Sequence, residues 1–146
     1  MISVQIECDT CFWVESAGMI RRILDAADVC MQALYALGYT SGPASVFGGV
    51  DEVSHTGYAS FTREYASYGE MRERLCPDYE AAMKRAPAEW IDALNFETLT
   101  VSVKKNGGTG GLTYSRGFLT LSLSSAGDEA EAERRCRDAI RPHLYS

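Results

Sequence analysis

The chain has 146 residues, of which 46% are hydrophobic and 23% are charged, and its formal net charge at pH 7 is −6. This length suits one domain, and both fractions are typical of globular proteins rather than of disordered chains. No apolar run approaches the roughly 20 residues of a membrane helix, and the acid-bearing start Met1–Glu7 is unlike a secretory signal, so we expect a cytoplasmic protein.

The first part of the chain predicts strands followed by a long helix. Residues 2–8 alternate apolar and polar side chains, which indicates a half-buried strand, and a second β-prone run over 11–14 suggests a tight hairpin. From Ile20 onward the apolar residues recur at helical spacing. They predict a long helix over about 20–37, with Gly38 as its stop.

The middle of the chain predicts loops and short helices. Residues 38–57 are rich in Gly, Ser and Pro, so we expect a long connection with at most a short strand at Ser45–Phe47, followed by a strand at Tyr58–Arg63. Ser67 and Glu70 have the spacing of a capping box. We expect that helix to end at Pro77, with two more short helices over 78–85 and 87–94, so that short helices occupy about 67–94.

Two strongly alternating runs, 97–104 and 118–124, predict an antiparallel pair joined by the glycine-rich segment 106–111. Residues 112–115 would belong to the returning strand, with Gly117 as a bulge. The last segment, about 128–141, predicts a helix whose acidic residues precede its arginines and complement the helix dipole. Its buried stripe would hold Ala132, Cys136 and Ile140.

Together these elements predict a single α+β domain over residues 1–146. We expect an antiparallel sheet of about four to five strands packed against the long helix (about 20–37) and the C-terminal helix (about 128–141), with the short helices inserted at about 67–94. We find no internal repeat that would indicate a repeat protein.

The five cysteines, at positions 8, 11, 30, 76 and 136, are odd in number and scattered, which favours reduced thiols. Cys8 and Cys11 have the spacing of half a zinc site. A second Cys-x-x-Cys or His-x-x-His pair is missing from the sequence, and a redox pair would need a helix N-terminus. We therefore favour a structural role for this pair, with a zinc-binding module as an alternative.

Two further features could carry chemistry. The glycine segment 106–111 follows Lys104 and Lys105 and could attract an anion, but it lacks the Lys-Ser/Thr ending of a phosphate-binding loop, so a hairpin tip is the simpler interpretation. A His-based catalytic arrangement would need His55 or His143, and neither lies in a specific motif. We assign no catalytic residue.

Residues 57–80 combine five tyrosine or phenylalanine rings with five acidic residues. Such a composition is typical of a protein-binding face, although the rings could equally belong to the core. The candidate partner-binding residues are Tyr65, Tyr68, Glu70, Glu73, Tyr79 and Glu80.

The function predicted from these observations is a non-enzymatic protein-binding domain that acts through this acidic, tyrosine-rich surface on a basic protein partner. An inhibitor of a host defence or nucleic-acid-binding complex, encoded by a phage or mobile element, would have this character. The acidic excess argues against direct nucleic-acid binding, which needs clustered Lys and Arg. An alternative is a small-molecule-binding domain or small enzyme with a pocket between sheet and long helix. A homodimer is compatible with each, for example through 118–124 at a sheet edge.

Overall fold

The computed structural model describes residues 2–5, 17–50, 60–85, 94–115, 117–124 and 126–144. Their elements are, in chain order, β1 (Ile2–Gln5), α1 (Ala17–Ala36), β2 (Thr40–Val50), β3 (Ser60–Tyr65), α2 (Tyr68–Arg85), β4 (Leu94–Lys105), β5 (Gly108–Ser115), β6 (Phe118–Ser124), α3 (Glu129–Ile140) and the 3-10 turn η3 (Arg141–His143). The strands form one antiparallel sheet in the order β1-β6-β5-β4-β2-β3. The predicted α+β class is confirmed, with six strands rather than four or five.

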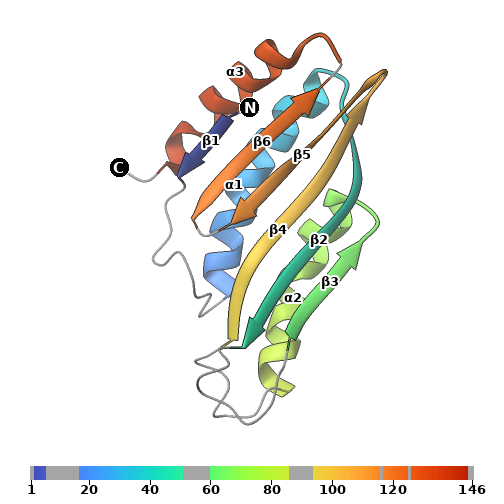
Figure 1. Ribbon diagram of the computed structural model, residues 1–146. Helices are drawn as coiled ribbons and strands as arrows, with labels where there is room; N and C mark the ends of the chain where they lie inside the picture. Colours follow the sequence, from blue (N-terminus) through green and yellow to red (C-terminus); the bar gives the residue numbers. More distant parts are fainter. Residues whose placement is uncertain are drawn as a thin grey trace.

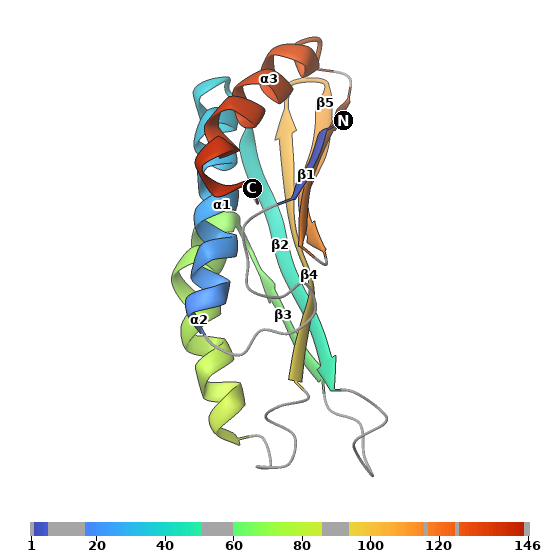
Figure 2. The same ribbon diagram turned by 90° about the vertical axis from the view of Figure 1, so that its left-hand side faces the viewer.

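The described elements form two layers. Figure 1 shows the sheet in front of α1 and α2, and Figure 2, turned by 90°, shows all three helices on one side of it. Helix α1 contacts both α3 and α2, and α2 also contacts β2 and β3. No described helix or strand lies on the opposite side of the sheet.

The helix-facing side of the sheet consists mainly of apolar residues arranged in rows across paired strands, and one row extends across all six strands. That row is Ile2–Leu121–Leu112–Val101–Ala44–Tyr65, and each of its members is at most 6% exposed. Helix α1 covers the sheet with residues that are fully buried, namely Ile20, Ile23, Ala27, Met31 and Leu34. Burying a large apolar side chain stabilises a fold by about 1.5–3 kcal/mol, so this layer contact is the main source of stability.

Helix α1 confirms the predicted long helix and its stop. It begins at Ala17, three residues before the predicted start, and ends at Ala36. Gly38 has a φ of 95°, and the Tyr39 amide donates to the Leu34 carbonyl at 3.0 Å. Glycine adopts this left-handed conformation without a steric penalty, so it lets the chain leave the helix and enter β2.

Strand β2 corrects the prediction of a long connection over 38–57. It is an 11-residue strand that pairs with both β4 and β3. The composition of this segment resembles that of a loop, because residues such as Gly42 and Pro43 are rare in strands. The register with β4 shifts between Ser41 and Ala44, and this irregularity accommodates the pair.

Helix α2 corrects the prediction of separate short helices. It runs unbroken from Tyr68 to Arg85 with Pro77 inside it. The predicted capping box is confirmed, since the Glu70 amide donates to Ser67 Oγ at 3.2 Å while the Glu70 carboxylate accepts from the Ala66 amide at 3.1 Å. A proline costs a helix one hydrogen bond, and the buried residues Met71, Leu75 and Tyr79 on either side of it outweigh that loss.

Strands β4, β5 and β6 correct the prediction of a two-stranded hairpin with a glycine-rich tip. The turn is only Asn106-Gly107, because Lys105 already pairs with Gly108 and the remaining glycines belong to β5. Gly117, with a φ of 91°, lies in the connection from β5 to β6 and is not a bulge. Strand β6 pairs with β1 and β5, so it is not a sheet edge and cannot pair with a copy of itself there.

Helix α3 confirms the predicted C-terminal helix, and its buried residues are the expected Ala132, Cys136 and Ile140. Leu94, expected at the end of a third short helix, is instead the first residue of β4. The rest of that helix and the predicted strand over 11–14 lie outside the described residues. None of the described helices is long and apolar enough to span a membrane.

Candidate functional site

The side of the sheet opposite the helices, which we call the open face, consists of two complete rows and their flanking residues. The first row is Phe118–Ser115–Thr98–Phe47–Thr62, whose backbone pairing continues to position 5 of β1, and the second is Ser3–Thr120–Thr113–Thr100–Ser45–Glu64. The flanking residues are Ser102, Lys104, Thr109, Ser122 and Ser124. Successive side chains of a strand point to opposite faces. Since the apolar residues face the helices, the residues between them face the open side.

The open face contains few charged residues. Hydroxyl side chains predominate, and in the second row Ser3 Oγ and Thr120 Oγ1 lie 3.0 Å apart. Among the side chains that the structure describes on this face, the charged ones are Glu64, on the edge strand β3, and Lys104, near the end of β4. The charged side chains of the described helices lie on the other layer, so the centre of the open face is uncharged.

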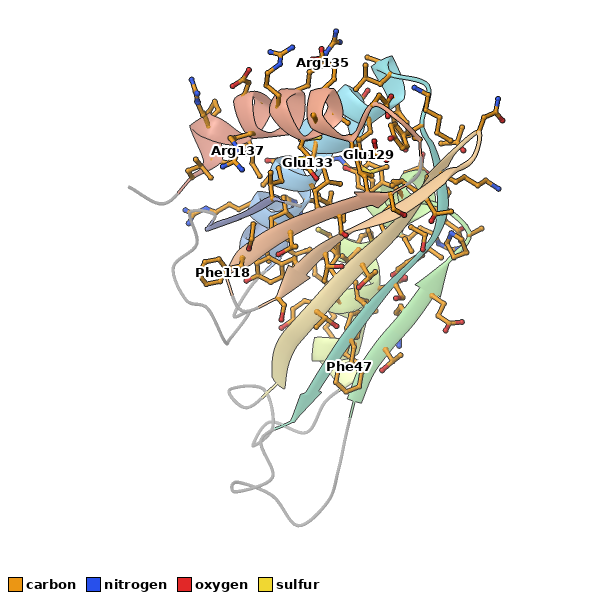
Figure 3. The ribbon with its side chains drawn as sticks, turned by 45° about the horizontal axis from the view of Figure 1, so that its top comes forward. Phe47, Phe118, Glu129, Glu133, Arg135 and Arg137 are labelled. Carbon is orange, nitrogen blue, oxygen red and sulfur yellow. The ribbon has the colours of Figure 1, made fainter. Side chains whose placement is uncertain are left out.

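Two large aromatic rings stand on this face. Phe47 is 41% exposed and Phe118 is 47% exposed, and they are the only large hydrophobic side chains among the described residues that are so exposed. Phe47 follows the buried Val46, and Phe118 precedes the buried Leu119, so strand alternation turns both rings outward. Figure 3 shows them on β2 and β6, on either side of the two central strands.

A shallow hollow adjoins the second row near the β3 edge. It has a volume of about 450 Å³ and is lined by residues that include Pro43, Ser45, Glu64 and Thr100. It lies where β2 is irregular, between Ser41 and Ala44. The hollow therefore places the Glu64 carboxylate beside hydroxyl residues of the second row.

The tyrosines of the predicted partner-binding surface lie inside the molecule. Tyr65, Tyr68 and Tyr79 are all buried, and the Tyr79 ring contacts Phe61 edge-on at 5.3 Å between centroids. Tyr65 donates to Asp78 at 2.8 Å and Tyr68 to Asp28 at 2.9 Å. The rings therefore form part of the core between α2, α1 and the sheet, which is the alternative that the sequence left open.

Burial also changes the acidity of these tyrosines. It raises the pKa of Tyr79 to about 12 and, together with the hydrogen bonds to Asp78 and Asp28, raises the pKa values of Tyr65 and Tyr68. Desolvation disfavours a phenolate, and a carboxylate acceptor disfavours it further. All three hydroxyls remain protonated at neutral pH, and those of Tyr65 and Tyr68 act as structural donors.

The acidic residues of the predicted surface are close to arginines. Glu70 caps α2 and also lies 3.4 Å from Arg74, and Glu80 lies 3.8 Å from Arg21. Glu73 is exposed on α2. The described residues contain 13 acidic and 13 basic residues, so the net charge of the chain comes from the remaining residues. The helical surface that was expected to be acidic is balanced in charge.

The cysteines and histidines are the residues that the sequence offered for a metal or catalytic site. Cys30 and Cys136 are buried free thiols where α1 meets α3, and the Cys136 thiol donates to the Cys30 carbonyl at 3.6 Å. The hydrogen bond with Cys136 and burial raise the pKa of Cys30. Cys8, Cys11 and His55 lie outside the described residues, and His143 is half-buried in η3. No three His, Cys, Asp or Glu side chains in the described ranges are grouped to hold a metal.

The lysines that precede the β4–β5 turn differ in their surroundings. Lys105 Nζ lies 2.5 Å from Asp128, which also accepts from the Tyr39 hydroxyl at 2.7 Å. Lys104 is exposed beside a hollow of about 570 Å³ at the turn. Because the ammonium of Lys105 is already paired, one lysine remains to attract the anion that the sequence suggested.

The alternative of a ligand pocket placed it at the interface between the sheet and the helices, where the described residues are apolar. The buried residues on both sides of it are apolar, and the described part of the chain contains no buried polar or charged residue. A binding pocket normally places a few polar groups against a bound ligand. The described residues of this interface supply few polar groups that could orient a ligand.

Phe47 and Phe118 were not among the predicted site residues, although the sequence carried a signal for one of them. In 118–124 the leucines at 119, 121 and 123 mark the inward side, which places Phe118 with the outward Thr120 and Ser122. For Phe47 the alternation was masked by glycines and proline. Comparison of the chain with protein-family models, with curated proteins and with solved structures found no match.

Proposed function

We propose that this protein is a protein-binding domain and that its binding surface is the open face of the sheet. The observation that carries the proposal is the pair of exposed rings, Phe47 and Phe118, on a face with an uncharged centre. Aromatic residues are enriched, and charged residues depleted, at the centres of protein interfaces. A hydroxyl-rich surface can in addition donate and accept hydrogen bonds with a partner.

The organisation of the rest of the molecule supports this choice of surface. The helix-facing side of the sheet is filled, and the charges of α1 and α2 are largely paired with one another. Exposed ion pairs contribute little to binding or stability. Two statements remain predictions from the sequence. They are that the partner is a basic protein and that the domain is an inhibitor encoded by a phage or mobile element.

The test is site-specific photo-crosslinking in cells that express the chain from its own gene. A photoreactive phenylalanine analogue at position 118 or 47 should give adducts, because those side chains would lie inside the interface. The same analogue in place of Gln32, which is exposed on α1, is the matched control. Equal adduct yields at positions 118, 47 and 32 would contradict the proposal.

A further inference from the structure

We propose that the partner of the open face is a second copy of this chain. In this arrangement two sheets pack face to face about a two-fold axis that runs along the strands between β5 and β4. The inference rests on the proposed function, since it names the protein that the same face binds. A two-fold interface must be self-complementary, so each residue has to fit its counterpart across the axis.

The positions of the two rings satisfy this requirement. Phe118 and Phe47 belong to one row, in which Ser115 and Thr98 separate them. Phe118 is on the second strand from one edge of the sheet, and Phe47 is on the second strand from the other. They are three strand spacings apart, roughly 14 Å, with the centre of the sheet midway between them. The axis would therefore place Phe47 of each copy against Phe118 of the other.

The polar residues and charges fit the same axis. It brings Thr100 opposite Thr113 of the second copy, and Ser45 opposite Thr120. A hydroxyl both donates and accepts, so each such pair can satisfy itself without a countercharge. Glu64 comes opposite Ser3, and Lys104 opposite Thr109, so no like charges meet. An uncharged face of this kind fits its own copy better than a strongly charged partner.

The size of the face predicts the strength of the dimer. Six strands and about three rows of residues cover roughly 30 Å by 20 Å, so two copies would bury roughly 1,200 Å² in total. This buried area lies at the lower end of the range for specific interfaces. Packed sheets keep their strand directions within about 30° of each other, so the strands of the two copies would be nearly aligned. We expect a reversible dimer with a dissociation constant in the micromolar range.

The first test is sedimentation velocity of the full chain under reducing conditions, from micromolar to millimolar concentration. The expected result is a reversible monomer–dimer equilibrium. Phe118→Ser and Phe47→Ser should each weaken it about tenfold or more, because each removes an aromatic side chain that packs against its counterpart in both halves of the interface. The matched control Gln32→Ser, on the other layer, should leave it unchanged. Both rings are exposed, and thermal unfolding checks that the serine variants stay folded.

The second test determines the axis. Phe47→Cys and Phe118→Cys chains, mixed and treated with a short bismaleimide, should give a cross-link between positions 47 and 118, identified by peptide mass. Packed sheets place facing residues roughly 10 Å apart, which is too far for a direct disulfide but within reach of this reagent. Phe47→Cys alone should not link to itself, because the two copies of position 47 would lie roughly 17 Å apart, about 14 Å along the row and about 10 Å between the sheets. A 47–47 link, or a chain that stays monomeric at every concentration, overturns the inference.

The outcomes of the two proposals can be told apart. A photo-crosslink from position 118 to a different protein, with a monomeric chain in sedimentation, overturns self-association and leaves the open face as a binding surface. An adduct of two identical chains supports both proposals. Absence of any adduct at 118 and 47, together with a monomer, removes both.

Discussion

Gly110 shows at the scale of a single residue why the β4–β5–β6 segment contains so much glycine. A Cβ atom on Gly110 would collide with the Ser122 carbonyl oxygen and with Leu123 on β6. Gly111, the next residue, would place its Cβ no closer than 3.5 Å to the Val101 carbonyl oxygen, which is ordinary contact. Gly108 is constrained in the same way as Gly110, because a Cβ there would collide with Ala126, whereas Gly111 is not constrained by close approach.

We expect Gly110→Ala to lower the free energy of unfolding by about 1–3 kcal/mol, the usual cost of forcing extra atoms into a packed site. Gly111→Ala is the matched control, with a change within about 0.5 kcal/mol. Urea denaturation of the two variants and the parent chain measures both values. Equal destabilisation by the two substitutions would contradict the close approach of β5 and β6.

Asp128 predicts a pH dependence of stability. Hydrogen bonds from Lys105 and Tyr39 hold its pKa below the ordinary value. Between the folded and unfolded pKa values the unfolded chain binds more protons, so this contribution is present above about pH 4 and is lost as the pH falls through the folded value. Asp128→Asn should flatten the acid limb of the stability curve, and Lys105→Gln should act in the same direction. An unchanged acid limb in both variants would refute this role.

The buried thiols of Cys30 and Cys136 predict low reactivity. Only the thiolate attacks an alkylating reagent. The raised pKa of Cys30 lowers its thiolate fraction, and burial of both sulfurs hinders access of the reagent. In the folded protein at neutral pH, N-ethylmaleimide should leave both residues unmodified, whereas urea should expose them. Peptide mass mapping after a timed reaction reports each site. Rapid labelling of either thiol without denaturant would show that the α1–α3 contact opens easily.

At the scale of elements, α2 shows how tertiary packing overrides a local signal. Pro77 lacks the amide that would bond to the Glu73 carbonyl, and its exposed ring faces solvent. Met71, Leu75 and Tyr79 still form one continuous buried stripe on the other side. The sequence showed the proline and both flanking helical segments, but not that one shared core face would join them.

Replacing Pro77 should therefore stabilise the protein. Pro77→Ala restores one helix hydrogen bond and removes a cost of about 3 kcal/mol, while the greater freedom of the unfolded chain takes back about 1 kcal/mol. We expect a net gain of roughly 1–2 kcal/mol in urea denaturation. Glu73→Ala, one turn earlier on α2, should change stability by less than about 0.5 kcal/mol. A loss of stability in Pro77→Ala would mean that the proline fits its site.

The edge strand β3 illustrates how an element is protected. Its helix-facing side carries Arg63 between the buried Phe61 and Tyr65, and the guanidinium lies 4.7 Å from the centroid of the Phe61 ring. Charged residues on an edge strand hinder pairing with another chain. This protection is consistent with an interface on the face of the sheet rather than along its edge.

At the scale of the whole molecule, the strand order predicts a gradient of local stability. Strands β5 and β4 are central and paired on both sides, whereas β1 and β3 form the edges. Native-state hydrogen exchange should give Val101 and Leu112 amides opening free energies close to that of global unfolding, and β3 amides lower ones. Dilute protein keeps any self-association out of the measurement. Equal protection of β3 and β4 would contradict this sheet order.

The sequence by itself determined the fold class, helices α1 and α3, the capping box of α2 and the strongly alternating β4 and β6. In each of these the signal is local, because periodicity and caps depend on residues a few positions apart. The sequence did not predict the full length of β2 or the continuity of α2, because glycine and proline residues interrupt the periodic pattern in both segments.

Only the tertiary structure decided which residues are available to a partner. In the sequence, the tyrosines and acids of 65–80 resemble a binding surface. In the structure, α1 and the sheet bury the rings, and arginines lie close to two of the acidic residues. Phe47 and Phe118 are distant in sequence and become one row through strand pairing. The physical reason is that burial and cross-strand neighbours are set by contacts between distant segments, which no local spacing encodes.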